Sequence, residues 1–182
     1  MYFRLCRASL FLLLILPGAS HAAPISEYQL KSAFLYNFAT FLDWPGSMGT
    51  SLTLCVAVPE DALKYFTMLE GKPVGNSKVT VRRLTADDSA EGCRILFVAE
   101  SESGSFEDWL TEVGDEQVLT VAESELWLKK GVVLDLMIQE KRVVFDVNVD
   151  AARGEGIIIN SRLLRLARKV YGLGSGDEPA EK

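Results

Sequence analysis

Few side chains in this sequence could act as nucleophiles, bases or metal ligands. The only histidine, His21, lies in an N-terminal stretch that we expect to be cleaved, so the mature chain would contain none. Ser-His and Cys-His catalysis and histidine-based metal sites are then excluded. The Gly-x-Ser-x-Gly motif of serine hydrolases is also absent from the sequence. We therefore predict that the protein is not an enzyme, and no cofactor is expected.

Two cysteines, Cys55 and Cys93, remain after the expected cleavage. In an oxidising compartment such an isolated pair favours a disulfide over a reactive thiol pair, because no histidine is nearby to activate either thiol. The bond would close a loop of 38 residues. A loop of this length predicts a stabilisation of about 3–4 kcal/mol.

Two polar stretches could hold a small ligand. Asp87, Asp88 and Glu91 form an acidic loop, but the twelve-residue pattern of alternating oxygen ligands that binds calcium is missing. Residues 101–105 are rich in serine and precede a predicted helix, whose N-terminus would suit an anion. Glu102 would repel a phosphate there, so an ordinary strand-to-helix loop is favoured. We predict no metal site.

The first 23 residues have the organisation of a secretory signal peptide. Arg4 and Arg7 give a positive start, residues 8–16 form an apolar run, and small residues follow up to a cleavage site after Ala22 or Ala23. The apolar run is shorter than the roughly 20 residues that a membrane-spanning helix needs. We therefore predict an exported, periplasmic protein with no direct membrane insertion.

The expected mature chain is acidic and has the length of one domain. Cleavage leaves 17 basic and 25 acidic side chains, so nucleic acid is a poor partner, because a phosphate backbone needs a basic surface. Residues 24–171 are predicted to form a single domain. Residues 172–182 are polar and rich in glycine, which predicts a disordered tail.

Apolar periodicity predicts strands that alternate with helices. An opening helix is expected at residues 26–43, with Ser26 and Gln29 as a capping box and an apolar face made of Leu30, Ala33, Phe34, Phe38, Phe41 and Leu42. Strands are expected at residues 52–58, 78–84, 93–99 and 117–121, helices at 60–70 and 106–113, a helical turn at 123–129, and a hairpin from 132–138 and 142–149. This pattern is typical of an α/β fold: a mainly parallel sheet with an antiparallel hairpin addition and helices on both faces, in three Rossmann-like layers.

The last part of the chain is predicted to form a strand, an elbow, a second apolar run and a closing helix. β-Branched residues dominate residues 143–149 and 157–159, and two glycines punctuate the elbow between them. Asn160 or Ser161 would cap the closing helix, whose apolar residues Leu163, Leu164, Ala167 and Val170 recur at helical spacing.

Several sequence features occur together in a definite order. After the signal peptide come residues 33–41 running into Trp44-Pro45, then Leu54-Cys55-Val56, Cys93 at the start of a buried strand, Phe145-Asp146-Val147-Asn148, Ala151-Ala152, Gly156, Ile158 and residues 161–167. This ordered set resembles the YfiR family of bacterial periplasmic proteins. The resemblance spans about residues 26–170, nearly the whole mature domain.

The resemblance implies regulation rather than catalysis. YfiR-like proteins bind the periplasmic sensor part of an inner-membrane diguanylate cyclase and inhibit it, which lowers cyclic di-GMP and regulates biofilm formation. An OmpA-like outer-membrane lipoprotein can sequester the repressor. Family members are described as homodimers with an α/β fold and a disulfide that matches Cys55 and Cys93. A second disulfide of the best-known member, near the hairpin and closing strand, has no counterpart in this sequence.

For partner binding we select the hairpin and elbow, with Phe145, Asn148, Glu155 and Ile158. The alternative is that Phe145 and Ile158 belong to the core and that Asn148 caps the turn. A second functional hypothesis is a periplasmic small-ligand sensor or transporter accessory protein, which would bind a metabolite at the carboxyl ends of the parallel strands. A dominant apolar cleft would favour that hypothesis, whereas a flat exposed patch would favour the repressor.

Overall fold

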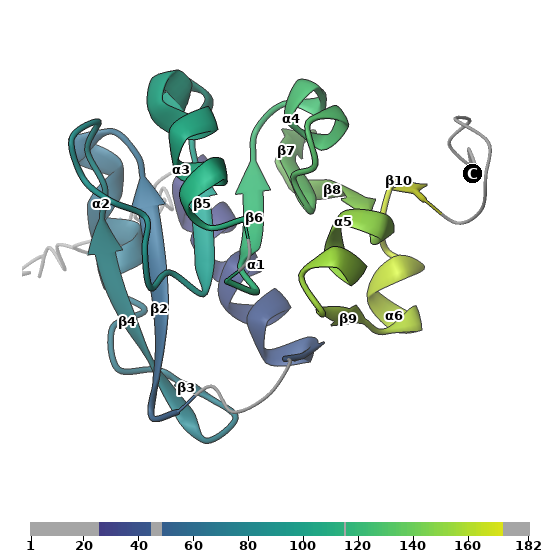
Figure 1. The fold of residues 1–182 in the computed structure, drawn as a ribbon, viewed down its shortest axis with the longest axis horizontal. Coiled ribbons are helices and arrows are strands. Elements are labelled where there is room, and N and C mark those ends of the chain that lie inside the picture. Colours follow the sequence, from purple (N-terminus) through teal and green to yellow (C-terminus); the bar gives the residue numbers. More distant parts are fainter. Residues whose placement is uncertain (1–25, 45–48, 115, 173–182) are drawn as a thin grey trace, which may run out of the picture.

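An eight-stranded mixed sheet forms the centre of the molecule (Figure 1). The computed structural model describes residues 26–44, 49–114 and 116–172, so the predicted signal peptide and residues 173–182 of the predicted tail lie outside the described residues. The strands, in spatial order, are β10 (Lys169–Tyr171), β8 (Arg142–Asn148), β7 (Leu134–Gln139), β6 (Leu119–Ala122), β5 (Ile95–Val98), β2 (Ser51–Ala57), β4 (Ser77–Arg83) and β3 (Pro73–Val74).

The strand directions confirm the predicted α/β class. Neighbouring strands are parallel except in two pairs, β3 with β4 and β7 with β8. The second pair is the hairpin expected from the sequence. Gln139 lies opposite Arg142, so the turn consists of two residues, Glu140 and Lys141, which have φ angles of 48° and 62°. Glycine or asparagine usually occupies such left-handed positions.

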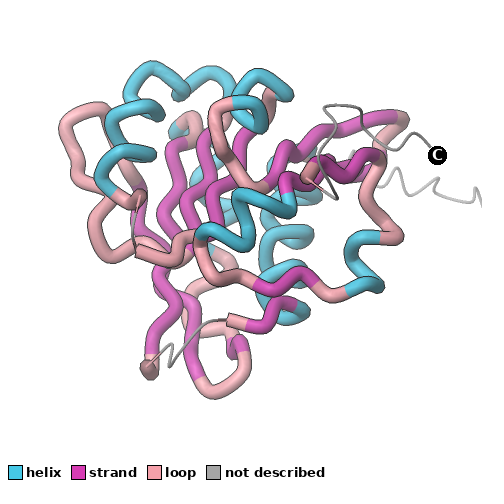
Figure 2. The backbone as a smooth tube through the Cα atoms, turned by 45° about the vertical axis from the view of Figure 1, so that its right-hand side comes forward, coloured by secondary structure: helices cyan, strands magenta, loops and turns pink. Residues whose placement is uncertain are grey.

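Helices cover both faces of the sheet, as Figures 1 and 2 show. α1 (Glu27–Phe41) and α2 (Glu60–Thr67) pack on one face. The 3₁₀ helix η1 (Glu100–Ser105) leads into α3 (Phe106–Glu112), which packs with α4 (Glu125–Lys129) on the opposite face. Successive residues of β2 enter different cores, because side chains alternate across a strand. The predicted three layers are therefore present.

α1 differs from its prediction in its cap and in its buried face. Ser26 occupies the N-cap position, but its side chain makes no capping hydrogen bond. Ala33 is exposed and Phe41 is 56% exposed, whereas the buried residues are Lys31, Ser32, Leu35, Phe38 and Ala39. Apolar residues occur all around this helix, so helical spacing alone could not select the face that is buried.

The C-terminal part contains two elements that differ from the prediction. The elbow holds a short helix, α5 (Val149–Gly154), which is followed by β9 (Ile158–Ile159) and α6 (Ser161–Leu164). The predicted closing helix ends at Leu164 and does not reach Val170. The chain turns instead into β10, because the Arg168 backbone N–H donates to the Phe145 carbonyl at 2.8 Å and begins a parallel ladder with β8.

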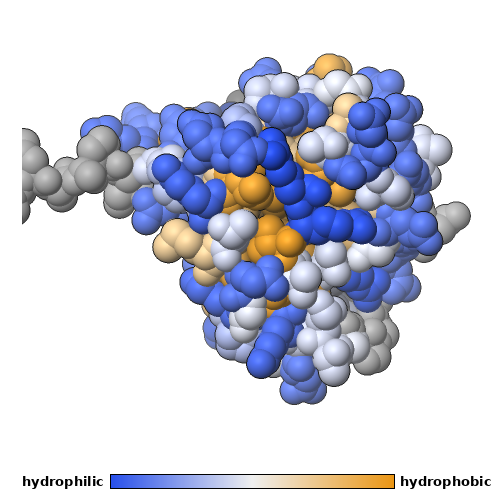
Figure 3. Space-filling view, turned by 90° about the vertical axis from the view of Figure 1, so that its left-hand side faces the viewer, coloured by the Kyte–Doolittle hydropathy of each residue, from blue (hydrophilic) through white to orange (hydrophobic). Residues whose placement is uncertain are grey.

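The opposite edge of the sheet, at β4, is only partly covered. β3 pairs with the beginning of β4 alone. Further along, the Val81 N–H donates to a carboxylate oxygen of Glu70 at 2.6 Å. Figure 3 views this side of the molecule, where hydrophilic side chains border a central apolar strip. Charged groups at an edge strand discourage pairing with another chain.

Candidate interaction surface

A small second sheet joins the end of α1 to the C-terminal part of the chain. β1 (Leu42–Asp43) runs antiparallel to β9, with Leu42 opposite Ile159 and Asp43 opposite Ile158. Asn160 fastens this ribbon, because its Nδ2 donates to the Phe41 carbonyl at 2.9 Å. Its Oδ1 accepts the N–H groups at the start of α6, which confirms Asn160 as the predicted cap.

Large apolar side chains are exposed at this ribbon. Ile158 is 63% exposed and Phe41 is 56% exposed. The register of β1 and β9 and the contact of Asn160 with Phe41 bring the two residues onto neighbouring segments, and we call them the ribbon surface. Leu166, which follows α6, is 71% exposed. Exposed apolar side chains that occur together are typical of protein contact sites.

Positive charge accompanies the ribbon surface. The whole sequence contains 19 basic and 25 acidic residues, whereas residues 149–171 contain five basic and two acidic residues. Arg153, Arg162 and Arg165 are exposed, and the last two follow β9 closely in the chain. Asp43, which lies opposite Ile158, is exposed as well, so a partner that covers the ribbon surface would meet one carboxylate there and the arginines that follow β9 in the chain.

Of the four residues selected from the sequence, Ile158 lies on the ribbon surface and Phe145 lies in the core. Phe145 is 3% exposed. Its ring centroid lies 5.0 Å from that of Phe34 and 5.7 Å from that of Phe38, both on α1. Phe145 thus joins the opening helix to the hairpin, and its side chain is not available on the surface.

Asn148 and Glu155 make hydrogen bonds within the domain. Asn148 caps α5 through its Oδ1, which accepts the Ala151 N–H at 2.9 Å, and its Nδ2 donates to the Leu128 carbonyl at 3.1 Å. Glu155 accepts the Val118 N–H at 3.1 Å. Both side chains therefore hold the segment that carries Ile158.

Phe41 and the exposed arginines were not selected from the sequence. Phe41 was placed on the apolar face of the opening helix, although it lies exposed at the last position of α1. The signal that could have found the arginines is their spacing, since Arg162 and Arg165 follow Asn160 within five residues of an otherwise acidic chain. Local clusters of one charge sign can steer the association of a partner.

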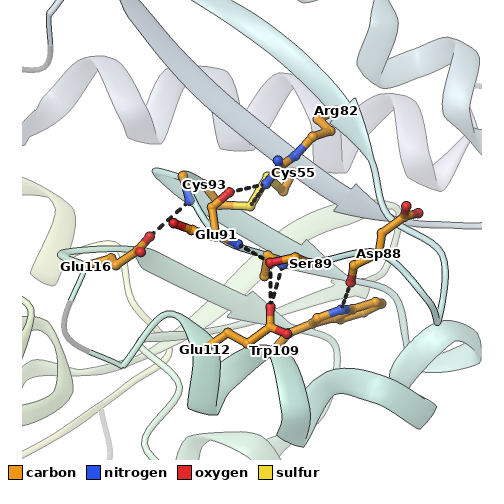
Figure 4. Close-up of a disulfide and its surroundings, with 11 residues drawn as sticks. Cys55, Arg82, Asp88, Ser89, Glu91, Cys93, Trp109, Glu112 and Glu116 are labelled. Atoms are coloured by element: carbon orange, nitrogen blue, oxygen red, sulfur yellow. Dashed lines mark hydrogen bonds between the residues drawn. A yellow bond between two sulfur atoms is a disulfide. The ribbon is translucent and has the colours of Figure 1, made fainter.

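The expected disulfide between Cys55 and Cys93 joins β2 to the segment before β5 (Figure 4). Both cysteines are fully buried, and their Cα atoms are 5.7 Å apart. Nη2 of Arg82 lies 3.3 Å from Sγ of Cys55 and 3.1 Å from Sγ of Cys93, and it also donates to the Glu91 carbonyl at 2.6 Å. The bond is therefore a staple inside the domain, covered by a guanidinium.

Carboxylates around the acidic loop accept hydrogen bonds from the loop itself. Asp88 accepts both the N–H and the hydroxyl of Thr85, and these bonds hold the pKa of Asp88 below its ordinary value. Glu112 of α3 accepts the Ala90 N–H at 2.7 Å (Figure 4). Among the described residues, no group of three or more histidine, cysteine or acidic side chains is arranged to hold a metal ion.

The carboxyl ends of β5 and β6, where the alternative hypothesis places a small ligand, are covered by the start of α1. Lys31 is buried, and its Nζ lies 2.8 Å from Oε1 of Glu123, the residue after β6. The Lys31 ammonium also lies 4.9 Å from the ring centre of Tyr28, and burial together with the Glu123 charge raises the pKa of Tyr28. A ligand at this position would have to displace a buried ion pair.

The structure is an α/β domain that exposes large apolar side chains at the ribbon of β1 and β9. A family model described as DUF4154, YfiR/HmsC-like, matches residues 28–168, and the chain belongs to this family. The YfiR family is regulatory, non-catalytic and periplasmic. Comparison with curated proteins gave no match. In the part of the chain that the structure describes, no helix is both long and apolar enough to span a bilayer.

Solved structures share the fold at low sequence identity. A conserved domain protein from Vibrio cholerae O1 biovar eltor is 12% identical, with a TM-score of 0.56 over 80% of this chain and 60% of that chain. The ABC domain from Streptococcus pneumoniae in complex with L-Trp is 10% identical, with a TM-score of 0.52 over 79% of this chain and 60% of that chain. This chain thus spans 60% of the length of each structure, and the likeness shows the fold alone.

Proposed function

We propose that this protein is a periplasmic repressor, which binds the periplasmic sensor part of an inner-membrane diguanylate cyclase and thereby lowers cyclic di-GMP. Membership of the YfiR/HmsC-like family over residues 28–168 is the observation that carries the proposal. Binding inhibits the cyclase only if the repressor contacts the inactive form better than the active form. An OmpA-like outer-membrane lipoprotein would release the cyclase by sequestering the repressor, which acts as a homodimer.

The ribbon surface is the partner-binding surface in this proposal. Ile158 and Phe41 supply the apolar contact, and the nearby Arg162 and Arg165 supply positive charge. Apolar side chains at the centre of an interface provide most of its affinity, whereas charges at the rim mainly raise the association rate. The partner should therefore offer an apolar patch with acidic groups beside it.

Phe145 acts through this surface because its side chain is buried, whereas Asn148 and Glu155 are half-buried and hold the surface in place. Phe145 fixes α1 against β8, while the other two residues hold α5 and the chain before β9. Substitution at these positions should lower the amount of folded protein. Substitution of Ile158 should lower the affinity for the cyclase and leave the amount of folded protein unchanged.

The test compares cyclic di-GMP in a strain that lacks this protein and carries a matching cyclase. Removal of the protein should raise cyclic di-GMP, and the unmodified protein should restore the low level. Ile158→Asp should fail to restore it, although the abundance and melting temperature of the variant stay unchanged. Met68→Asp is the matched control, because Met68 is 65% exposed at the end of α2, and this variant should repress fully.

Two outcomes would contradict the proposal at different levels. Cyclic di-GMP that stays constant when the protein is removed would exclude repression. Full repression by Ile158→Asp would be compatible with the repressor function, but it would show that the ribbon surface does not bind the cyclase.

A further inference from the structure

Two buried aspartates face each other across the β7–β8 hairpin. Asp135 of β7 lies directly opposite Asp146 of β8 in the antiparallel register. Asp135 is 1% exposed and Asp146 is fully buried. Opposed residues of an antiparallel pair have Cβ atoms about 5 Å apart on the same face of the sheet. The two carboxyl groups therefore share one small region of the interior.

Among the described residues, Asp146 has hydrogen-bond partners and Asp135 has none. Asp146 accepts two bonds from the guanidinium of Arg168, from Nε at 2.8 Å and from Nη2 at 2.5 Å, and it also accepts the Lys169 N–H at 3.1 Å. Both carboxyl oxygens of Asp135 lack a hydrogen-bond partner within the described ranges. A buried carboxylate without partners is costly, so the neutral form is favoured at Asp135.

The groups around Asp135 are mostly negative. Burial first, and then the charge of Asp146, raise the pKa of Asp135 to about 6, while the charge of Arg168 opposes this shift. Glu125 of α4 and Glu123 after β6 add smaller effects of the same sign as Asp146. From β10, Tyr171 lies near Arg168, and burial raises the pKa of the Tyr171 hydroxyl. Two carboxyl groups in one site cannot both ionise easily.

We propose that Asp135 and Asp146 form a proton-sensitive clamp on β10, the last strand of the sheet. When Asp135 is protonated, its O–H can donate to Asp146, which remains anionic and holds Arg168 and the Lys169 N–H. When Asp135 releases its proton to solvent, a second negative charge faces the Arg168 guanidinium. The attraction on Arg168 then becomes stronger, and β10 separates less easily from β8.

The direction of the pH effect follows from proton linkage. The charge of Arg168 lowers the pKa of Asp135, so separation of β10, which takes Arg168 away, makes Asp135 bind its proton more tightly. The attachment of β10 is therefore weakest at low pH, strengthens as the pH rises through the pKa of Asp135, which is about 6, and stays stronger above it. For unfolding of the whole chain the sign is opposite, because burial raises the pKa of Asp135 above its ordinary value of 3.8 in the folded state.

The test measures hydrogen-exchange protection of the amides in residues 168–171 at pH 5 and pH 8, with intrinsic exchange rates taken into account. In the unmodified full chain, protection should rise by roughly threefold or more towards pH 8. Asp135→Asn replaces the protonated acid by a neutral group that can still donate, so this variant should show the same, lower protection at both pH values. Asp87→Asn changes an exposed aspartate in the loop before Asp88 and should behave as the unmodified chain.

A second measurement tests the clamp without any substitution. The ¹³C resonance of the Asp135 carboxyl group should titrate well above the range of exposed aspartates. An Asp135 resonance that titrates near pH 4 would overturn the proposal, and so would protection of residues 168–171 that is equal at both pH values. If the protection of residues 168–171 also loses its pH dependence in Asp87→Asn, that dependence does not come from Asp135 and Asp146.

Discussion

The two halves of the sheet differ in the kinds of side chain that they bury and expose. In the parallel half, β2 to β6, every residue of β5 and β6 is buried, and a disulfide joins β2 to the chain before β5. In the terminal half, β7 to β10, two acids lie in the interior, a turn uses left-handed non-glycine residues, and Ile158 is exposed. The parallel half is thus held by buried apolar strands and a disulfide. The features from which we propose partner contact and a pH response lie in the terminal half.

The largest expected effect tests whether the two halves depend on each other. Phe145→Ala removes a buried ring that packs against Phe34 and Phe38, so the free energy of unfolding should fall by about 3–5 kcal/mol. Urea unfolding followed by circular dichroism measures this loss. Ile158→Ala is the control and should change stability by less than about 0.5 kcal/mol. If Phe145→Ala and Ile158→Ala lower the free energy of unfolding equally, Phe145 and Ile158 cannot be separated into a core residue and a surface residue.

The next effect concerns the disulfide of the parallel half. Cys55→Ser with Cys93→Ser should lower the free energy of unfolding by about 3–4 kcal/mol, because the unfolded chain regains the freedom of a 38-residue loop. Thermal or urea unfolding gives the value. A reducing agent should destabilise the unmodified protein and leave the double variant unchanged. If the double variant is as stable as the unmodified protein, the staple does not explain the stability of this half.

A smaller effect of opposite sign is expected at the hairpin turn. Glu140→Asn with Lys141→Gly places residues that tolerate positive φ at both turn positions, so the protein should gain about 1 kcal/mol of stability. The urea midpoint should rise at an unchanged slope. Glu140→Val, a β-branched residue at the same position, should lower the midpoint. A lower midpoint in the Asn-Gly variant would show that the turn is not strained.

The smallest effect contrasts Asp88 in the parallel half with Asp135 in the terminal half. The side-chain and backbone bonds from Thr85 hold the pKa of Asp88 below its ordinary value of 3.8. Its contribution to stability is therefore present above that value and is lost as the pH falls through the lower, folded value, which is the reverse of Asp135. Asp88→Asn should reduce the loss of stability below pH 4, as measured by urea midpoints across pH. If the urea midpoint falls below pH 4 in the same way in Asp88→Asn and in the unmodified protein, Asp88 does not contribute to the loss of stability in acid.

Sequence patterns predicted the parallel half well because each element there has a single local signal. The apolar runs that became β2 and β5 are bounded by turns, and the resulting strands lie within a few residues of their predicted limits. The hairpin of β7 and β8 was likewise found from two apolar runs around a polar turn. Local pattern and tertiary structure agree in this region.

The terminal half was predicted less well because distant contacts decide its structure. Val170 has helical spacing from Leu163 and Ala167, yet it lies in a strand that exists only because β8 offers its edge. The exposure of Phe41 likewise depends on which face of α1 meets Phe145, and a helix that is apolar all round does not specify that face. Asp135 inside an apolar run was a visible signal, but its partner across the hairpin follows only from the register.

The bond from Asn160 to the carbonyl of Phe41 joins residues 119 positions apart in the chain. Contacts of this separation form slowly, because a long loop must close before they contribute. During entry into the periplasm, α1 therefore cannot reach its final place until almost the whole domain has crossed the membrane. During that interval the aromatic residues of α1 have no β8 to cover them, so the entering chain should be most prone to aggregation, and most dependent on periplasmic chaperones, until residues 142–148 arrive.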